Sequence, residues 1–184
     1  MSNARFSSAQ QVYETFPMLQ GDVTATPADE APLDFLDKLA TTDTPEDAVS
    51  FAAYLLDRRE AVWWASQCVR QMGSPVNREE EVALLTAEAW VRDPEEHRRA
   101  AALDLGLNGN HKLPGSWVAL AAGGAGGTML VGQSPGPPVP MHLCAKAARS
   151  AVLIALARMP FRERASYIQR CADLCRKLIA HHSQ

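Results

Sequence analysis

The chain has 184 residues, of which 47% are hydrophobic and 21% are charged, and its formal net charge at pH 7 is −3. These values are those of an ordinary globular protein that is long enough to bury a sizeable core. The net negative charge argues against a general nucleic-acid-binding protein, because such a protein needs a basic surface.

Charge is distributed unevenly along the chain. Residues 1–57 contain ten acidic and two basic side chains, a balance of −8, whereas residues 140–184 contain eight basic and two acidic side chains, a balance of +6. In one interpretation the two portions pack together or face solvent separately. In the other, one of them docks a partner of opposite charge.

The cysteine pattern and the apolar stretches bear on the compartment. The four cysteines lack the spacing of a secreted disulfide framework, and residues 1–5 contain no apolar signal-peptide segment. The uncharged residues 117–131 are fewer than the roughly 20 that a membrane-spanning helix needs, and they include four glycines. We therefore predict a cytoplasmic protein with reduced thiols and no membrane insertion.

The N-terminal part is predicted to be an acidic arm, residues 1–43, with short helices at 7–16 and 33–41. Ser7 or Ser8 is the expected cap of the first of these helices. Residues 44–184 are predicted to form the helical domain.

Capping sequences predict where the helices of this domain begin. Thr44 and Asp93 are each followed by proline and then by a carboxylate, so each is expected to accept hydrogen bonds as an N-cap, with proline in the first helical position. Asn77 and Ser116 are expected to act as caps in the same way. Helices are predicted at about 44–56, 57–72, 77–92, 94–105 (ending near Gly106), 117–122, 141–158 and 161–181.

Apolar periodicity predicts which helix faces are buried. The inner stripe of helix 77–92 is expected to be Val82, Leu85 and Ala89, with Trp90 beside them. Helix 141–158 is apolar on most sides, which is typical of a central helix. In helix 161–181 an apolar seam steps by alternating four and three residues: Phe161, Ala165, Ile168, Ala172, Cys175 and Ile179.

Residues 123–140 are predicted to form a glycine- and proline-rich loop, with a short extended piece at 128–131. The segment 123–128 resembles a phosphate-binding loop, but no lysine follows it and no strand precedes it. We interpret its glycines as a flexible helix exit, where glycine permits positive φ. The predicted fold is all-α: a single-domain bundle of about seven to eight helices, in which helical hairpins stack.

Few side chains are candidates for catalysis or metal binding. Cys171 and Cys175 lie on one helix face but lack a clear second pair of ligands, so we expect them to pack in the core. Three histidines, His97, His111 and His142, are scattered without a recognisable catalytic partner. We predict no catalytic residue, no metal and no cofactor.

A cluster of arginine and tryptophan is the stronger candidate for a functional site, because both residue types are enriched at interaction hot spots. The predicted partner-binding residues are Arg58, Arg59, Trp63, Trp64 and Trp90. Adjacent tryptophans point about 100° apart on a helix, so one of the pair is expected in the core and the other at its edge. The competing interpretation is a helix start with internal ion pairs and one buried tryptophan.

Four segments together resemble an uncharacterised proteobacterial family of small helical proteins, over about residues 45–160. They are Arg-Arg-Glu-Ala-Val-Trp-Trp-Ala at 58–65, Ala-Glu-Ala-Trp-Val-Arg-Asp-Pro at 87–94, Ser-Trp-Val-Ala-Leu-Ala-Ala at 116–122 and Lys-Ala-Ala-Arg-Ser-Ala-Val-Leu at 146–153. Members of that family are often encoded near type VI secretion genes for spike proteins and their toxic effectors. The resemblance implies an accessory role in that system and no catalytic residue.

The predicted function is a non-enzymatic protein-interaction module, in its most specific form an adaptor for a type VI secretion effector or spike protein. One alternative is an immunity protein that inhibits a co-encoded toxin, with its acidic N-terminal segment covering a basic active site. Another is an enzyme with an unrecognised site. The expected partner is a protein rather than a nucleic acid, and the sequence leaves the oligomeric state open.

Overall fold

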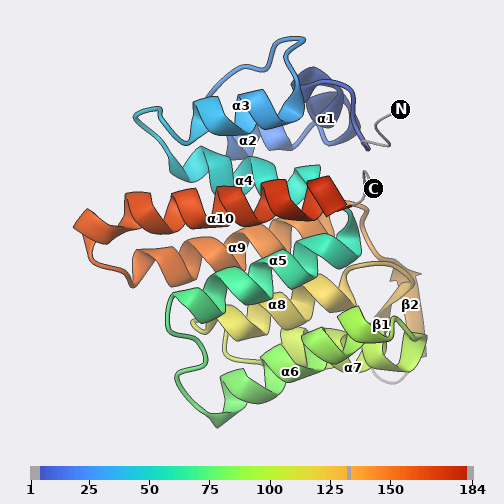
Figure 1. Ribbon diagram of the computed structural model, residues 1–184. Coiled ribbons are helices and arrows are strands. Elements are labelled where there is room, and N and C mark those ends of the chain that lie inside the picture. The colour runs from blue at the N-terminus through green and yellow to red at the C-terminus, as the bar shows by residue number, and fades with distance from the viewer. Residues whose placement is uncertain (1–4, 132–133, 182–184) are drawn as a thin grey trace. The chain divides into compact units, whose positions relative to one another are not determined.

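The computed structural model describes residues 5–131 and 134–181, and over these residues the chain forms ten α-helices and one two-stranded hairpin (Figure 1). The predicted all-α fold class is confirmed, with more helices than the seven to eight expected. The chain forms two compact units, one from residues 1–57 and 160–184 and the other from residues 58–159. None of the described helices combines the length and the apolar character that crossing a membrane requires.

The helices of the first unit are α1 (Ala9–Thr15), α2 (Leu19–Asp22), α3 (Pro32–Leu39), α4 (Glu46–Leu55) and α10 (Phe161–His181). α4 is buried along most of its length and packs against α2, α3 and α10. Aromatic rings join the short helices to it: the Phe51 ring centroid lies 5.0 Å from that of Phe35 and 6.3 Å from that of Tyr13. The segment predicted as an arm therefore contributes buried side chains of its own.

The caps of this unit match the sequence prediction in one case of two. The Ser8 hydroxyl accepts the Gln11 N–H at 3.3 Å, as expected of an N-cap. The predicted cap at Thr44 is wrong, because its hydroxyl donates to Asp47 Oδ2 at 2.9 Å and α4 begins at Glu46. Asp47 Oδ2 also accepts the Thr24 N–H at 2.8 Å, from the loop between α2 and α3, so this carboxylate rather than the hydroxyl organises the helix start.

The apolar seam of α10 is only partly packed. Ile168, Ala172 and Cys175 are buried, as predicted. Phe161 is 87% exposed, and no side chain of residues 161–167 is buried. The seam therefore continues for two turns beyond the packed part of the helix.

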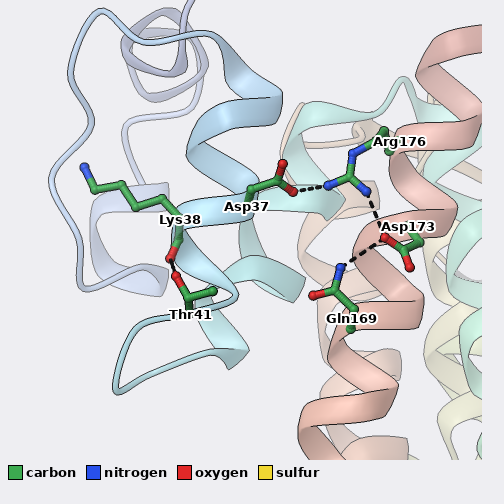
Figure 2. Close-up of polar contacts among 6 residues, drawn as sticks. All are labelled: Asp37, Lys38, Thr41, Gln169, Asp173 and Arg176. Atoms are coloured by element: carbon green, nitrogen blue, oxygen red, sulfur yellow. Dashed lines mark hydrogen bonds and ion pairs between the residues drawn. The ribbon is translucent and has the colours of Figure 1, made fainter.

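Opposite charges meet within the first unit. Arg176 of α10 forms ion pairs with Asp37 of α3 and with Asp173, the latter at 2.8 Å (Figure 2). Gln169 donates to the same Asp173 carboxylate at 3.0 Å, and the Thr41 hydroxyl donates to the Lys38 carbonyl at the end of α3. These contacts are of the kind expected if the acidic and basic portions of the chain pack together.

The second unit contains α5 (Arg58–Gln71), α6 (Arg78–Arg92), α7 (Glu96–Asn108), α8 (Pro114–Gly123) and α9 (Leu143–Ala157), with the strands β1 (Thr128–Val131) and β2 (Ser134–Pro138). α8 contacts α5, α6, α7 and α9, and nearly all of its residues are buried. α9, the predicted central helix, is largely buried and packs against α5 and α8.

Three helix boundaries in this unit differ from prediction. Asp93 ends α6 rather than capping α7, since its N–H donates to the Ala89 carbonyl. α8 begins at Pro114, so Ser116 is buried inside the helix instead of capping it. α7 continues through Gly106 to Asn108, and this glycine permits a close approach to α8 rather than ending the helix: a Cβ would lie 2.5 Å from Leu120 Cα.

The glycine- and proline-rich segment contains a hairpin. Thr128 lies opposite Pro138 and Val131 opposite Ser134 in an antiparallel pair, so the predicted extended piece is confirmed. The second strand was not predicted, because its sequence Ser-Pro-Gly-Pro-Pro removes backbone donors. A two-stranded ribbon tolerates these prolines, since each strand has an edge that needs no partner.

Candidate interaction surface

The five predicted partner-binding residues lie on α5 and α6 of the second unit, and burial separates them. Trp64 is fully buried and Trp90 is 7% exposed, whereas Trp63 is half-buried and Arg58 and Arg59 are exposed. The adjacent tryptophans are therefore divided between core and edge, as the helix geometry requires. A partner cannot reach the Trp64 and Trp90 rings in this conformation, so a partner-binding role for these two does not fit their burial.

Arg59 closes the carboxyl end of α6. Its Nε donates to the Val91 carbonyl at 2.6 Å, and Nη2 donates to the Arg92 carbonyl at 3.4 Å. The last carbonyls of a helix have no partner within the helix, and a cation there also complements the helix dipole. This predicted binding residue is thus also a structural link between α5 and α6.

Arg58 and Arg99 hold the glycine-rich segment that follows α8. Arg58 Nη1 donates to the Ala125 carbonyl at 2.9 Å. Arg99, which is buried, donates from Nη1 to the Gly123 carbonyl at 2.5 Å and from Nη2 to the Thr128 carbonyl at 3.1 Å. An anion site needs backbone N–H groups directed at the ligand, whereas here the segment is gripped through its carbonyls.

The exit of α8 does not use positive φ, since its cap Gly124 has φ of −82°; the positive φ of this segment lies further on, at Gly127, with φ of +68°. Arg99 is itself held by Glu96, with contacts of 2.8 Å to Oε2 and 2.6 Å to Oε1. The hydrogen bond from Arg99 lowers the pKa of Glu96, an effect that burial opposes and the Arg99 charge reinforces. The loop is therefore part of a fixed polar network.

A buried carboxylate joins the middle of α5 to α6. Glu88 accepts the Ser66 hydroxyl at 2.5 Å and forms a bidentate pair with Arg70, at 2.6 and 3.1 Å. Burial is the largest single influence and would raise the pKa of Glu88. The hydrogen bonds from Arg70 and Ser66, with the charges of Arg70 and Arg92, outweigh burial and lower it. Arg92, four residues further along α6, acts on Glu88 through its charge alone and is thus secondary to Arg70.

These contacts show where Trp63 lies. Arg59, Ser66 and Arg70 all contact α6, and with Trp63 they recur on α5 at spacings of four, three and four residues. Residues at such spacings share one face of a helix. The half-buried Trp63 ring therefore lies at the border between α5 and α6, one turn from the Arg59 cap.

The predicted inner stripe of α6 is wrong. Val82 is 38% exposed and Leu85 46% exposed, while Ala89 is half-buried. The buried face comprises instead Glu80, Ala83, Leu84, Ala87, Glu88 and Trp90. The apolar spacing predicted the wrong face because both faces of the helix carry small or apolar residues. The inner face also contains two buried carboxylates, which apolar periodicity does not register.

Glu80 is the other buried carboxylate. Its side chain accepts the Ser74 hydroxyl at 2.8 Å, the Val76 N–H at 2.8 Å and the Gly115 N–H at 3.0 Å. Its own N–H donates to Asn77 Oδ1 at 2.9 Å, so the predicted Asn77 cap is confirmed. Glu80 thereby joins the turn before α6 to the first turn of α8. The capping spacing from Asn77 is the only sequence signal for this role.

The described residues form a polar depression but no cluster of metal ligands. Among the described residues no three His, Cys, Asp or Glu side chains are grouped as metal ligands would be. Cys171 and Cys175 are buried, consistent with the packing role predicted for them. A polar depression of about 460 Å³ lies at the start of α1, lined by Ser7, Ser8, Gln10, Gln11, Glu14 and Asp29. None of these six was a predicted site residue.

Comparison with known proteins identifies the family but no individual relative. The chain belongs to a family of unknown function, DUF6931, whose model matches residues 35–179. The match includes all of the second unit and therefore Arg58, Arg59 and Trp63. No curated protein and no solved structure matches the chain.

Proposed function

We propose that this protein is a non-enzymatic interaction module that binds another protein through the amino-terminal half of α5. The contact surface consists of Arg58, Arg59 and Trp63, and is called the α5 surface below. The observation that supports this proposal most is the partly exposed Trp63 ring on the helix face that carries the Arg59 cap. A large ring on a rigid element, flanked by guanidinium groups, has the composition of an interaction hot spot.

The rigidity of this surface favours binding. Arg59 ties α5 to the end of α6, and the bidentate Arg70–Glu88 pair ties the two helices together further along. Arg58 is anchored through the Ala125 carbonyl. A partner would therefore meet side chains that are already positioned, which reduces the conformational entropy lost on binding.

In its most specific form, the proposal is that the partner is a type VI secretion effector or spike protein. Its support is the resemblance of four segments to proteins encoded near such genes. Two of these segments, residues 58–65 and 87–94, meet in the structure where Arg59 caps α6. The segments that carry the resemblance thus include those that form the proposed surface.

Affinity capture from the native cell tests the proposal. The tagged protein is compared with Trp63→Ala and with Trp117→Ala, which removes another half-buried tryptophan, on α8. We expect the unmodified protein and Trp117→Ala to recover an effector or spike protein, and Trp63→Ala to recover roughly tenfold less, as loss of a hot-spot ring predicts. Circular dichroism establishes that both variants are folded.

Equal recovery by the two tryptophan variants would contradict the α5 surface as the binding site. Recovery of no effector or spike protein would contradict the secretion form of the proposal. If the purified chain instead abolished the activity of a captured toxin at one-to-one stoichiometry, the protein would be an immunity protein rather than an adaptor.

A further inference from the structure

The residues of β2 and the two that follow it, 134–140, have a backbone that their sequence makes stiff and extended. Pro135, Pro137, Pro138 and Pro140 lie in this stretch, and each of its other residues directly precedes a proline. The ring fixes φ at about −65° in every proline, and a residue before proline is held in the extended or polyproline II region. Residues 134–140, called the proline segment below, are therefore ordered before any partner binds them.

The pairing of β2 with β1 follows the three-residue period of a polyproline II helix. Pro135 and Pro138 lie opposite residues 130 and 128 of β1, so three residues of β2 span the same length as two of β1. Because a polyproline II helix has three residues per turn, residues three apart share one edge. The edge that contains Pro135 and Pro138 faces β1. Pro137 and Pro140 are also three apart, share a different edge and are both exposed.

The backbone of the proline segment offers many hydrogen-bond acceptors and few donors. Between residues 135 and 140 only Gly136 and Val139 have an N–H group, and that of Val139 donates to the Gly127 carbonyl at 3.0 Å. A strand added by another chain would need donors as well as acceptors along this edge, so the prolines disfavour extension of the sheet. A partner must instead bring donors of its own and a surface that accepts proline rings.

We propose that the proline segment docks into a groove lined by aromatic side chains on a partner protein. Tryptophan and tyrosine have the required chemistry, because their rings pack against proline while the indole N–H and phenol O–H groups donate to backbone carbonyls. The exposed rings of Pro137 and Pro140 are the two anchors, spaced as in a Pro-x-x-Pro ligand. Since the segment is already extended, little conformational entropy is lost when it binds.

Hydrogen-bond complementarity thus identifies the kind of partner, and the register with β1 identifies the edge that it contacts. The edge of Pro135 and Pro138 is occupied by β1, which leaves the edge of Pro137 and Pro140 for the groove. This inference goes beyond the proposed function. It involves the proline segment rather than the α5 surface, so either can fail without the other.

A panel of purified SH3 and WW domains, whose aromatic grooves bind proline-rich segments, is the probe. Each isotope-labelled domain is titrated with the full chain and followed by NMR. We expect chemical-shift changes confined to the aromatic groove of at least one domain. Replacing both Pro137→Ala and Pro140→Ala should weaken this binding at least roughly tenfold, since each substitution removes two ring methylenes from the contact. The matched control is Pro138→Ala, on the edge that faces β1, which should change the affinity less than about twofold.

Three results would overturn the proposal. The first is a parent chain that binds no domain of the panel, and the second is a double variant that binds as well as Pro138→Ala does. The third is binding of a free peptide of residues 134–141 without binding of the folded chain, because the segment would then be inaccessible in the protein. A double variant that self-associates, together with a parent that binds no domain, would show that the prolines only block sheet extension. Thermal unfolding that is unchanged in the variants assigns any loss of binding to the proline edge.

Discussion

Glu80 and Glu88 are both buried on the inner face of α6, but their charges are balanced by different groups. Glu88 is paired with a guanidinium and a hydroxyl, whereas Glu80 accepts two backbone N–H groups and one hydroxyl. A carboxylate offers several acceptor sites and no donor, so only donors suit its surroundings. Both residues therefore position the turns and helices around them.

Replacing Glu80 by Gln should destabilise the second unit by about 2–3 kcal/mol, because the new NH₂ group would face donors in a buried site. Glu81→Gln is the control: that side chain is half-buried one position further along, and its replacement should cost less than about 0.5 kcal/mol. Urea unfolding measures both free energies. Equal effects would mean that the contacts of Glu80 contribute nothing to stability.

Glu88 should make stability depend on pH. Its pKa in the folded chain is lowered from the ordinary value of 4.5, so its stabilising contribution is present above that pH and is lost as the pH falls toward the folded-state value. Glu88→Gln removes this titration. At neutral pH it should cost about 2–3 kcal/mol, because Arg70 loses its ionised partner. The stability difference between parent and variant should therefore shrink as the pH falls below about 4.5; a difference that grows on acidification would contradict the sign of the shift.

At the scale of elements, two arginines hold the glycine-rich segment that follows the end of α8. Gly127→Ala would place a residue at φ of +68° and a Cβ 2.8 Å from the Arg99 guanidinium, so we expect a loss of about 2 kcal/mol. Gly126→Ala is the matched control, because its nearest neighbour is Arg58 Nη1 at 3.7 Å, an ordinary contact. Its effect should stay within about 0.5 kcal/mol. Comparable midpoints of urea unfolding for the two variants would show that the segment is not fixed as described.

The elements also show how much of the fold could be predicted from local sequence rules. Helix positions, the Ser8 and Asn77 caps and the division between Trp63 and Trp64 follow from local rules of spacing and capping. The burial of Glu80 does not, since one of its donors comes from Gly115, 35 residues away. Once that face of α6 is held inward, Leu85 must face out, and the predicted stripe is reversed. Apolar periodicity left the buried face of α6 ambiguous, and hydrogen-bond partners distant in sequence determine which face is buried.

At the scale of the whole molecule, the chain forms two units, and the first is assembled from both ends of the sequence. The second unit is continuous, has its own buried helix α8 and contains the α5 surface. We expect the isolated fragment 58–159 to be helical and to unfold cooperatively, since its five helices pack on one another and α8 contacts the other four. Circular dichroism during thermal unfolding checks this, and a fragment that lacks a cooperative transition would contradict the division into units.

The ion pair that joins the acidic and basic ends of the chain should contribute little to stability. Asp37 and Arg176 are both partly exposed, at 54% and 35% of their side-chain surfaces, so solvent and salt screen the pair. Asp37→Asn is expected to change stability by less than about 1 kcal/mol, with an effect that decreases as salt is added. Thermal unfolding at low and high ionic strength measures this, and a large, salt-independent loss would show that the pair behaves as a buried one.

Site-specific photocrosslinking in the native cell tests the central claim most directly. A photoreactive phenylalanine analogue is placed at residue 63, and separately at residue 117, another half-buried tryptophan position of the same unit. The proposed function predicts a covalent adduct from position 63, identified by mass spectrometry as an effector or spike protein, and little of it from position 117. Adducts of equal yield from both positions, or the absence of any heterologous adduct at residue 63, would contradict it.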